Sequence, residues 1–400
     1  MKIFINLLGI IVLLGIMYCM SSNKKKIDFK IILKAIAVQI IIAFLLVKFP
    51  LGRIAISKVS DIVTIILSYG SEGLQFLFGS LADGSAPTGF IFAIQTLGNI
   101  IFISALVAGL YYLGILGFIV EKLGWIVGKI FGTSQVESFV AVANMFLGQT
   151  ESPILVSKYL GKMTESEVML VLISGMGSMS ASIIVGYTAL GIPMEYLLIA
   201  STMVPVSSII ISKLMLPQAE AIVEIESVKM DSKGNNENII SAISSGAMEG
   251  MHMAMAVGTS LIAIISLVAL CNGILGIFGI TLEQIFSYIF APIGFLMGLD
   301  MNDILIAGQL LGSKLVLNEF VAFSELGPIL GSLDIRTGMM ISIALSGFAN
   351  ISSMGICVSG ISILCPEKRG QLAKLAFRAM IGGFCVSVLS ALFIGLILLF

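Results

Sequence analysis

Two acidic residues stand out because each interrupts a long apolar stretch. Glu151 lies in the run 144–153, where Gly148 and Pro153 bracket it, and Glu319 lies in a second polar run later in the chain. A carboxylate at membrane depth costs about 2.5 to 3.5 kcal/mol on insertion scales, so it persists where it faces a cavity or a partner. Glycine and proline both weaken a continuous helix. The two runs therefore predict broken helical segments that each present a carboxylate to a polar site.

The chemistry open to such a pair is that of charged acceptors. Carboxylates accept strong hydrogen bonds from adjacent hydroxyls, such as a ribose diol, and they also bind cations. Two broken, acid-bearing segments at corresponding positions of two halves are typical of a transporter binding site near the membrane midplane. The alternative for each is a structural carboxylate paired with a lysine, and Lys314 is the obvious candidate for Glu319.

Neutral polar side chains accompany the acidic runs. Amide and hydroxyl groups that can read a heterocycle or a sugar belong to Gln149, Thr150, Asn350 and Ser353. Phe348 adds a ring face for stacking. Neutral oxygens on Asn144, Ser178 and Ser182, together with carbonyl groups freed by a broken helix, can hold sodium. Taken alone, any of these residues is more often a helix-packing residue. Their interpretation as binding residues rests on their position beside the acidic runs.

The elements that position these residues must lie in a membrane. Of the 400 residues, 58% are hydrophobic and 11% are charged, whereas a soluble globular protein has about 25% charged residues. The composition therefore predicts an all-α polytopic membrane protein. A net charge of -1 gives no basis for nucleic-acid binding. The five cysteines show no C-x-x-C spacing, and a single histidine excludes a multi-histidine metal site, so we expect no cofactor.

We expect eight transmembrane helices and two re-entrant helical hairpins. The expected spans are 3–20, 29–47, 90–119, 167–190, 196–212, 253–272, 337–364 and 375–399. Interfacial helices are expected at 54–79, 121–129 and 280–298. Three lysines at 24–26 favour a cytoplasmic loop, which places both termini of this multi-pass plasma (inner) membrane protein outside the cytoplasm. The Glu151 hairpin then enters from the cytoplasm and the Glu319 hairpin from outside.

The second half repeats the first in the opposite orientation. Residues 273–276 echo 114–117, and Ser346-Gly347 echoes Ser174-Gly175. This inverted repeat predicts four divisions of the chain. They are N-terminal transmembrane and interfacial helices of a scaffold (1–89), a first repeat with the cytoplasmic-side hairpin as a gate (90–212), a cytoplasmic linker (213–245), and a second repeat with the outer-side hairpin (246–400).

Four stretches carry a family resemblance. Residues 148–153, 213–217, 318–323 and 348–353 resemble the signatures of the concentrative nucleoside transporters of bacterial type, in order along nearly the whole chain. The resemblance implies a homotrimer in the lipid bilayer, with a scaffold and a mobile transport domain in each protomer. Ser152 and Phe323 depart from the pattern, where many members have alanine and tyrosine, which leaves the choice between purine and pyrimidine open.

The resemblance also implies roles for individual residues. The nucleobase would meet Gln149, Thr150 and Glu151, with Phe348 and Ile183 against it. The ribose would be held by Glu319, Asn350 and Ser353. Sodium would lie by Asn144, Ser178 and the carbonyl groups of Leu147 and Met179.

The expected function is secondary active import of nucleosides, coupled to sodium entry by alternating access. An alternative is a proton-coupled nucleoside symporter that uses Glu151 or Glu319, although Asn144 and Ser178 favour sodium. An intramembrane enzyme with the two carboxylates as acid and base is a third reading. No serine–lysine or metal constellation of suitable spacing accompanies them, so the sequence predicts a transporter and not an enzyme.

Overall fold

The computed structural model describes residues 1–223, 228 and 236–400, and the regular elements in these ranges are helices. The first half contains α1 (Lys2–Cys19), α2 (Phe29–Val47), α3 (Pro50–Phe78), α4 (Phe92–Gln95), α5 (Leu97–Tyr112), α6 (Ile115–Phe131), α7 (Gln135–Ala143), α8 (Glu151–Leu155), α9 (Ser157–Leu160), α10 (Glu165–Gly177), α11 (Ala181–Ala189) and α12 (Met194–Met215). The second half contains α13 (Ile239–Leu275), α14 (Leu282–Leu296), α15 (Met301–Gly312), α16 (Glu319–Leu326), α17 (Ile335–Leu345), α18 (Ile351–Leu364) and α19 (Arg369–Leu398). The expected all-α class is confirmed.

Seven helical stretches in the described ranges are long and apolar enough to cross a membrane. They correspond to seven of the eight expected spans. The eighth expected span, 337–364, is divided into two shorter helices, α17 and α18. The helices α14 and α15, bent by 119°, also reach the required length when taken together. The structure is therefore that of a multi-pass membrane protein whose helices are interrupted more often than expected.

One interruption shortens the expected span 90–119. The chain leaves α5 at Tyr112, and Gly114 then adopts a left-handed conformation with φ 76°. Glycine takes this conformation without the steric cost that a Cβ would bring. The amphipathic helix α6 consequently starts at Ile115, earlier than the expected 121.

Two further interruptions divide the expected spans 167–190 and 337–364. Helix α10 ends at Gly177 and α11 begins after Ser180, while α17 ends at Leu345 and Asn350 caps α18. Sequence periodicity alone predicts continuous helices here, because small polar residues only weakly disfavour a helix.

The two interruptions cross each other. The Phe348 main-chain N–H donates to the Ser178 carbonyl oxygen at 3.1 Å. Gly347, with φ 99°, lies so close that a Cβ there would be 2.7 Å from the carbonyl oxygen of Gly177. Only glycine satisfies both the backbone angle and the close approach.

The crossing also sets the register of the inverted repeat. Ser178 is the C-cap of α10 and Ser346 is the C-cap of α17. Ser178 follows Glu151 by the same number of residues as Ser346 follows Glu319. The counterpart of Ser346 is therefore Ser178, and the expected pairing of Ser346 with Ser174 is wrong by one helical turn.

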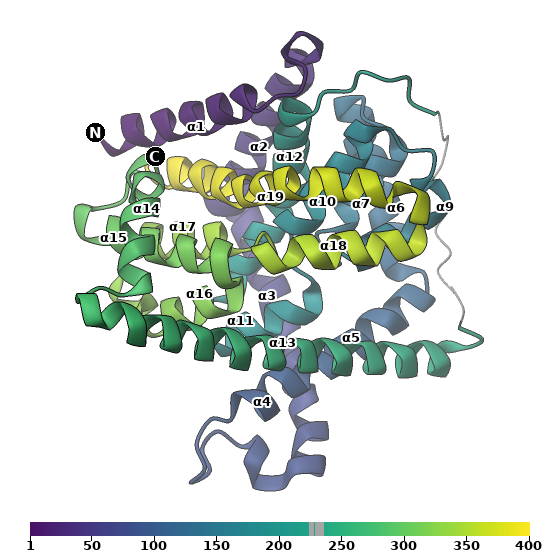
Figure 1. The fold of residues 1–400 in the computed structure, drawn as a ribbon. Coiled ribbons are helices and arrows are strands. Elements are labelled where there is room, and N and C mark those ends of the chain that lie inside the picture. The colour runs from purple at the N-terminus through teal and green to yellow at the C-terminus, as the bar shows by residue number, and fades with distance from the viewer. Residues whose placement is uncertain (224–227, 229–235) are drawn as a thin grey trace.

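Close helix packing places α13 beside α5 along one edge of the molecule (Figure 1). Cβ atoms added at Gly246 and Gly250 of α13 would lie 2.4 Å from Ala108 and 2.8 Å from Ile101 on α5. In the same way, a Cβ at Gly308 of α15 would lie 2.4 Å from the Ser287 carbonyl oxygen of α14. Small residues of this kind let helix backbones approach closely in a membrane.

The connection between the two halves is shorter than the expected linker 213–245. Helix α12 continues to Met215, and Asn238 caps the start of α13 through the Ser241 N–H. The polar part of the expected linker falls largely on residues 224–227 and 229–235, which lie outside the described residues.

Candidate functional site

The two glutamates occupy equivalent places in the two halves. Residues 144–150 connect α7 to α8, and Glu151 is the first residue of α8. A π-helical extension, Ser313–Leu317, and Asn318 connect α15 to α16, and Glu319 is the first residue of α16. Asn318 fixes this start by accepting a hydrogen bond from the Val321 N–H at 2.9 Å. Each glutamate thus begins the second arm of a short helical pair.

Glu319 is held by two donors. It is only 5% exposed, and its Oε1 accepts from the Tyr187 hydroxyl at 3.1 Å while its Oε2 accepts from Asn350 Nδ2 at 2.9 Å. Buried carboxylates need such partners, because leaving them unpaired is costly. Tyr187 was missed in the sequence, where it reads as an apolar packing residue. Its spacing of one turn from Ile183 puts both on one face of α11 and is the signal that could have found it.

Lys314 does not pair with Glu319, so that alternative is wrong. Its Nζ donates instead to the carbonyl oxygens of Ala344 and Ser346, both at 2.8 Å, and to Ser387 Oγ at 2.6 Å. The hydrogen bonds to the Glu319 carboxylate therefore come from neutral donors.

A chain of hydrogen bonds connects Glu319 to the other glutamate's loop. Asn350 Oδ1 accepts from the Ser353 N–H at 3.0 Å, and Gln149 Nε2 donates to Ser353 Oγ at 3.4 Å. Cys357, which the sequence did not single out, donates its thiol to Gln149 Oε1 at 3.2 Å. Four of the expected substrate residues, Gln149, Glu319, Asn350 and Ser353, are thus brought together.

The apolar members of the expected site are buried beside this chain. Phe348 and Ile183 are each 7% exposed, and a Cβ added at Gly148 would lie 3.7 Å from the Phe348 ring. Thr150 packs toward Gly360 of α18, where an added Cβ would be 2.9 Å from its methyl group. The three side chains provide walls next to the polar groups.

Glu151 faces a different space. Its Oε2 accepts from the Gly148 N–H at 3.1 Å. The side chain lines a cavity of about 230 Å³ between α5, α13 and the 144–150 loop, together with Tyr111, Ser182 and Glu249. Glu319 is not among the residues that line this cavity. That one ligand touches both carboxylates stays a prediction.

The four expected sodium ligands are all buried, and Leu147 also lines the Glu151 cavity. Asn144 Nδ2 donates to Ser174 Oγ at 2.9 Å, but its Oδ1 is buried without a hydrogen-bond partner among the described residues. Ser178 donates its hydroxyl to the Gly175 carbonyl at 2.9 Å, which leaves its oxygen free to accept. Leu147 and Met179 are buried on the adjoining segments. A buried acceptor without a partner can serve as a cation ligand, although it is not unique here, because Asn6 Oδ1 and Gln39 Oε1 are also buried without a partner among the described residues.

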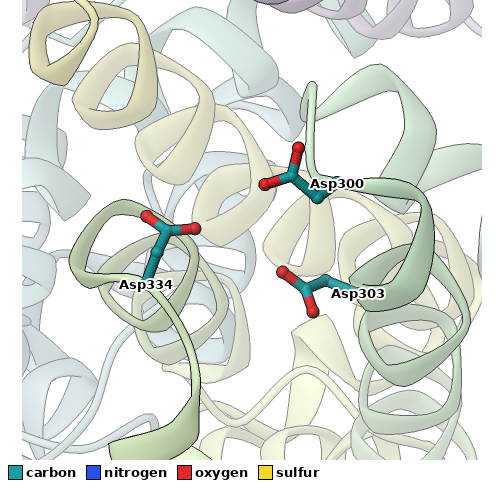
Figure 2. A group of neighbouring side chains, drawn as sticks. All are labelled: Asp300, Asp303 and Asp334. Carbon is teal, nitrogen blue, oxygen red and sulfur yellow. The ribbon is translucent and has the colours of Figure 1, made fainter.

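Three aspartates, Asp300, Asp303 and Asp334, form a further acidic group (Figure 2). Asp300 pairs with Lys2 at 2.8 Å, and Asp334 caps α17 by accepting from the Arg336 N–H at 2.8 Å. Partial burial raises the pKa of Asp334, but hydrogen bonds from Thr337 and Arg336 outweigh it and hold the pKa below its usual value. These contacts account for Asp300 as the partner of Lys2 and for Asp334 as a helix cap.

Three family models match the chain. Residues 8–81 and 196–395 match the N-terminal and C-terminal models described as Na+ dependent nucleoside transporter. Residues 93–194 match a model named Gate, described as nucleoside recognition.

Several relatives match over nearly the whole length of this chain. An uncharacterised transporter of Haemophilus influenzae is 39% identical over 99% of both chains, and nucleoside permease NupC of Helicobacter pylori is 35% identical over 98% of both. Sodium/nucleoside cotransporter 1 of Mus musculus is 30% identical over 98% of this chain and 63% of its own.

Solved structures agree with the sequence matches. CNTnw in an inward-facing substrate-bound state and a double variant of CNTnw in an outward-facing state each show a TM-score of 0.95 and 35% identity over 99% of both chains. The chain therefore belongs to the concentrative nucleoside transporter family, the Na+ dependent nucleoside transporters of the matching models.

Proposed function

We propose that this protein imports nucleosides across the plasma membrane together with sodium, by alternating access. The observation that carries the proposal is the hydrogen-bonded chain from Gln149 to Glu319. A nucleoside consists of a heterocycle joined to a diol-bearing sugar, and this chain offers an amide at one end and a carboxylate at the other. The chain is buried, so each hydrogen bond to the substrate would be made away from competing water.

The sugar belongs at the Glu319 end. Tyr187 and Asn350 hold the carboxylate in place, and its remaining lone pairs can accept from two vicinal hydroxyls. Ser353 is close enough to Asn350 to contribute its hydroxyl. The base would then lie toward Gln149, Thr150 and Glu151, against Phe348 and Ile183.

Sodium is the coupling ion that the buried oxygens support best. Asn144 Oδ1 and Ser178 Oγ are neutral acceptors, and main-chain carbonyls of Leu147 and Met179 complete a set without a carboxylate. A relative, sodium/nucleoside cotransporter 1 of Mus musculus, carries this ion in its name. The specific alternative is proton coupling through Glu151, which lies beside Tyr111 and Glu249 in the 230 Å³ cavity.

Alternating access is supported by the near-equal likeness to inward- and outward-facing structures. We assign the moving part to the two helical pairs that carry Glu151 and Glu319, since the crossing at Phe348 and Ser178 ties their supporting helices together. The fixed part contains α5 and α13, and assembly of three protomers would join such scaffolds.

The test is uptake into vesicles that contain the purified protein. Uridine or adenosine should accumulate above the external concentration when sodium is higher outside, and collapse of that gradient should stop accumulation. Accumulation that ignores sodium but follows an imposed proton gradient would replace sodium by protons. Equilibration without accumulation would indicate a passive channel instead.

A further inference from the structure

Lys314 is a buried cation with an unusual environment. It is fully buried in Ser313–Leu317, a π-helical extension of α15, and such segments are frequent at functional sites. Lysine is almost never fully buried unless it is paired. No ion pair to Lys314 occurs in the described part of the chain, and its Nζ contacts two carbonyl oxygens and the Ser387 hydroxyl. Its hydrogen-bond partners are therefore all neutral, and the Glu319 carboxylate acts on it only through charge, without a direct ion pair.

The hydrogen bonds favour the ammonium form of Lys314. The carbonyl groups of Ala344 and Ser346 can only accept, and Ser387 already donates its hydroxyl hydrogen to the Phe384 carbonyl at 2.9 Å. Three acceptors around Nζ require three N–H donors, which only the ammonium has. The Phe384 ring, 5.4 Å from Nζ, adds a favourable face for a cation.

The ammonium lies at the interruption between α17 and α18. The last carbonyl groups of a helix have no intrahelical partner and carry a partial negative charge, so a cation is favourable there. Ala344 is in the last turn of α17 and Ser346 is its C-cap. Lys314 thus joins the first arm of the Glu319 pair to the broken end of α17 and to α19.

The first repeat offers a comparable place with a different cation ligand set, although by the offset that relates Glu151 to Glu319 the counterpart of Asn144 is Gly312, two residues before Lys314. Ser178, the counterpart of Ser346, is the C-cap of α10, and the Asn144 side chain lies on the preceding helical pair. In the first repeat the hairpin contributes an amide oxygen that has no partner among the described residues, whereas in the second repeat it contributes an ammonium. Both places offer neutral oxygens at the end of an interrupted helix.

We propose that the Lys314 ammonium is a tethered cation that permanently occupies the end of the interrupted helix α17, as the exchangeable sodium would occupy the end of the interrupted helix α10 in the first repeat. The inference rests on the proposed sodium coupling. It assigns Lys314 a role in stoichiometry: the exchangeable ion enters only at the first interruption, because the second is already occupied by the protein's own charge.

The test compares two substitutions of Lys314. Lys314→Ser removes the charge, leaves the carbonyl oxygens and adds a hydroxyl, so sodium can enter. Lys314→Met keeps an apolar stem of similar length that fills the space. For purified protein without nucleoside, sodium chloride should raise the unfolding temperature of Lys314→Ser more than that of the wild type, relative to choline chloride. Lys314→Met should show no such additional rise.

Transport gives a second readout. In vesicles, the ratio of radioactive sodium to nucleoside taken up should double in Lys314→Ser. The control is the double variant Glu137→Gln/Lys213→Met, which removes the other buried lysine together with its partner at 2.6 Å. Its sodium response should match the wild type.

The outcomes separate this inference from the proposed function. Equal sodium responses of Lys314→Ser and Lys314→Met, or a Lys314→Ser protein that sodium fails to stabilise, would overturn the tethered-cation role. Wild-type uptake that ignores sodium would instead overturn the proposed coupling. In that case sodium-specific stabilisation of Lys314→Ser would still show a cation site that the lysine had filled.

Discussion

At the scale of single residues, Glu319 is the side chain on which substrate binding should depend most. Glu319→Gln keeps the size but replaces one acceptor oxygen by a donor facing the Asn350 amide. Hydrogen bonds to charged groups contribute about 1.5 to 3 kcal/mol, which corresponds to a loss of affinity of about tenfold to more than a hundredfold. Competition by uridine or adenosine in an uptake assay would measure this loss.

The matched control is Glu325→Gln on the same helix. Glu325 accepts from Gln309 and Ser313, away from the Gln149–Glu319 chain, so its substitution should leave nucleoside affinity unchanged. Unchanged affinity in Glu319→Gln would remove that residue from the sugar site.

Asn144 allows an equally direct test of the ion site. Asn144→Ala removes the unpaired Oδ1, so the sodium concentration for half-maximal uptake should rise while the set of competing nucleosides stays the same. Asn6→Ala is the control, because Asn6 is also fully buried with an unpaired Oδ1 and a single amide donation, to Met297. A similar rise in both variants would point to a general packing effect.

At the scale of elements, the crossing of the two interrupted helices should be sensitive to one methyl group. Gly347→Ala would place an alanine in a left-handed backbone conformation, which costs about 1 to 3 kcal/mol, and its methyl group would clash with Gly177. We expect a lower unfolding temperature and weaker binding of both nucleoside and sodium. Gly355→Ala on α18, where an added Cβ meets open space, should show neither effect. Loss of nucleoside binding alone would mean that the crossing does not serve the ion site.

The elements also show how far the sequence could be interpreted. Polar side chains within an apolar segment are easily recognised in a sequence, which is why Glu319, Asn350 and Gln149 could be singled out as candidate site residues. The hydrogen-bond partners of Lys314 are mostly main-chain carbonyl groups. Every residue has a main-chain carbonyl group, so no sequence pattern shows which of them Lys314 contacts. The interruptions after Gly177 and Leu345 contain no proline. Local residue preferences there are too weak to end a helix, so tertiary packing decides where each helix stops.

At the scale of the whole molecule, the proposed motion predicts which crosslinks stop transport. Ser182 on α11 contacts Met253 on α13, with Oγ 3.5 Å from Sδ. In a cysteine-free background, a disulfide between Ser182→Cys and Met253→Cys should join the moving and fixed parts and abolish uptake until it is reduced. Retained uptake with the disulfide formed would favour local gating over a moving domain.

The control crosslink lies within the proposed fixed part. A Cβ added at Gly109 of α5 would lie 3.3 Å from Ile243 of α13, so Gly109→Cys and Ile243→Cys can be joined. Uptake should survive this disulfide. Helix α14 is unsuitable as the fixed partner in such tests, because its backbone packs directly on α15 through Gly308.

The hydrogen bond from the Phe348 N–H to the Ser178 carbonyl has a thermodynamic consequence. In the proposed function Phe348 lies against the base and Ser178 binds the ion, so one peptide junction would serve both binding equilibria. Linkage is reciprocal: whatever factor sodium adds to nucleoside affinity, nucleoside must add to sodium affinity, and such factors typically correspond to about 1 to 3 kcal/mol. Without nucleoside, the sodium site would then bind its ion weakly. The state with sodium but no nucleoside would be rare, so the protein would transport little sodium alone.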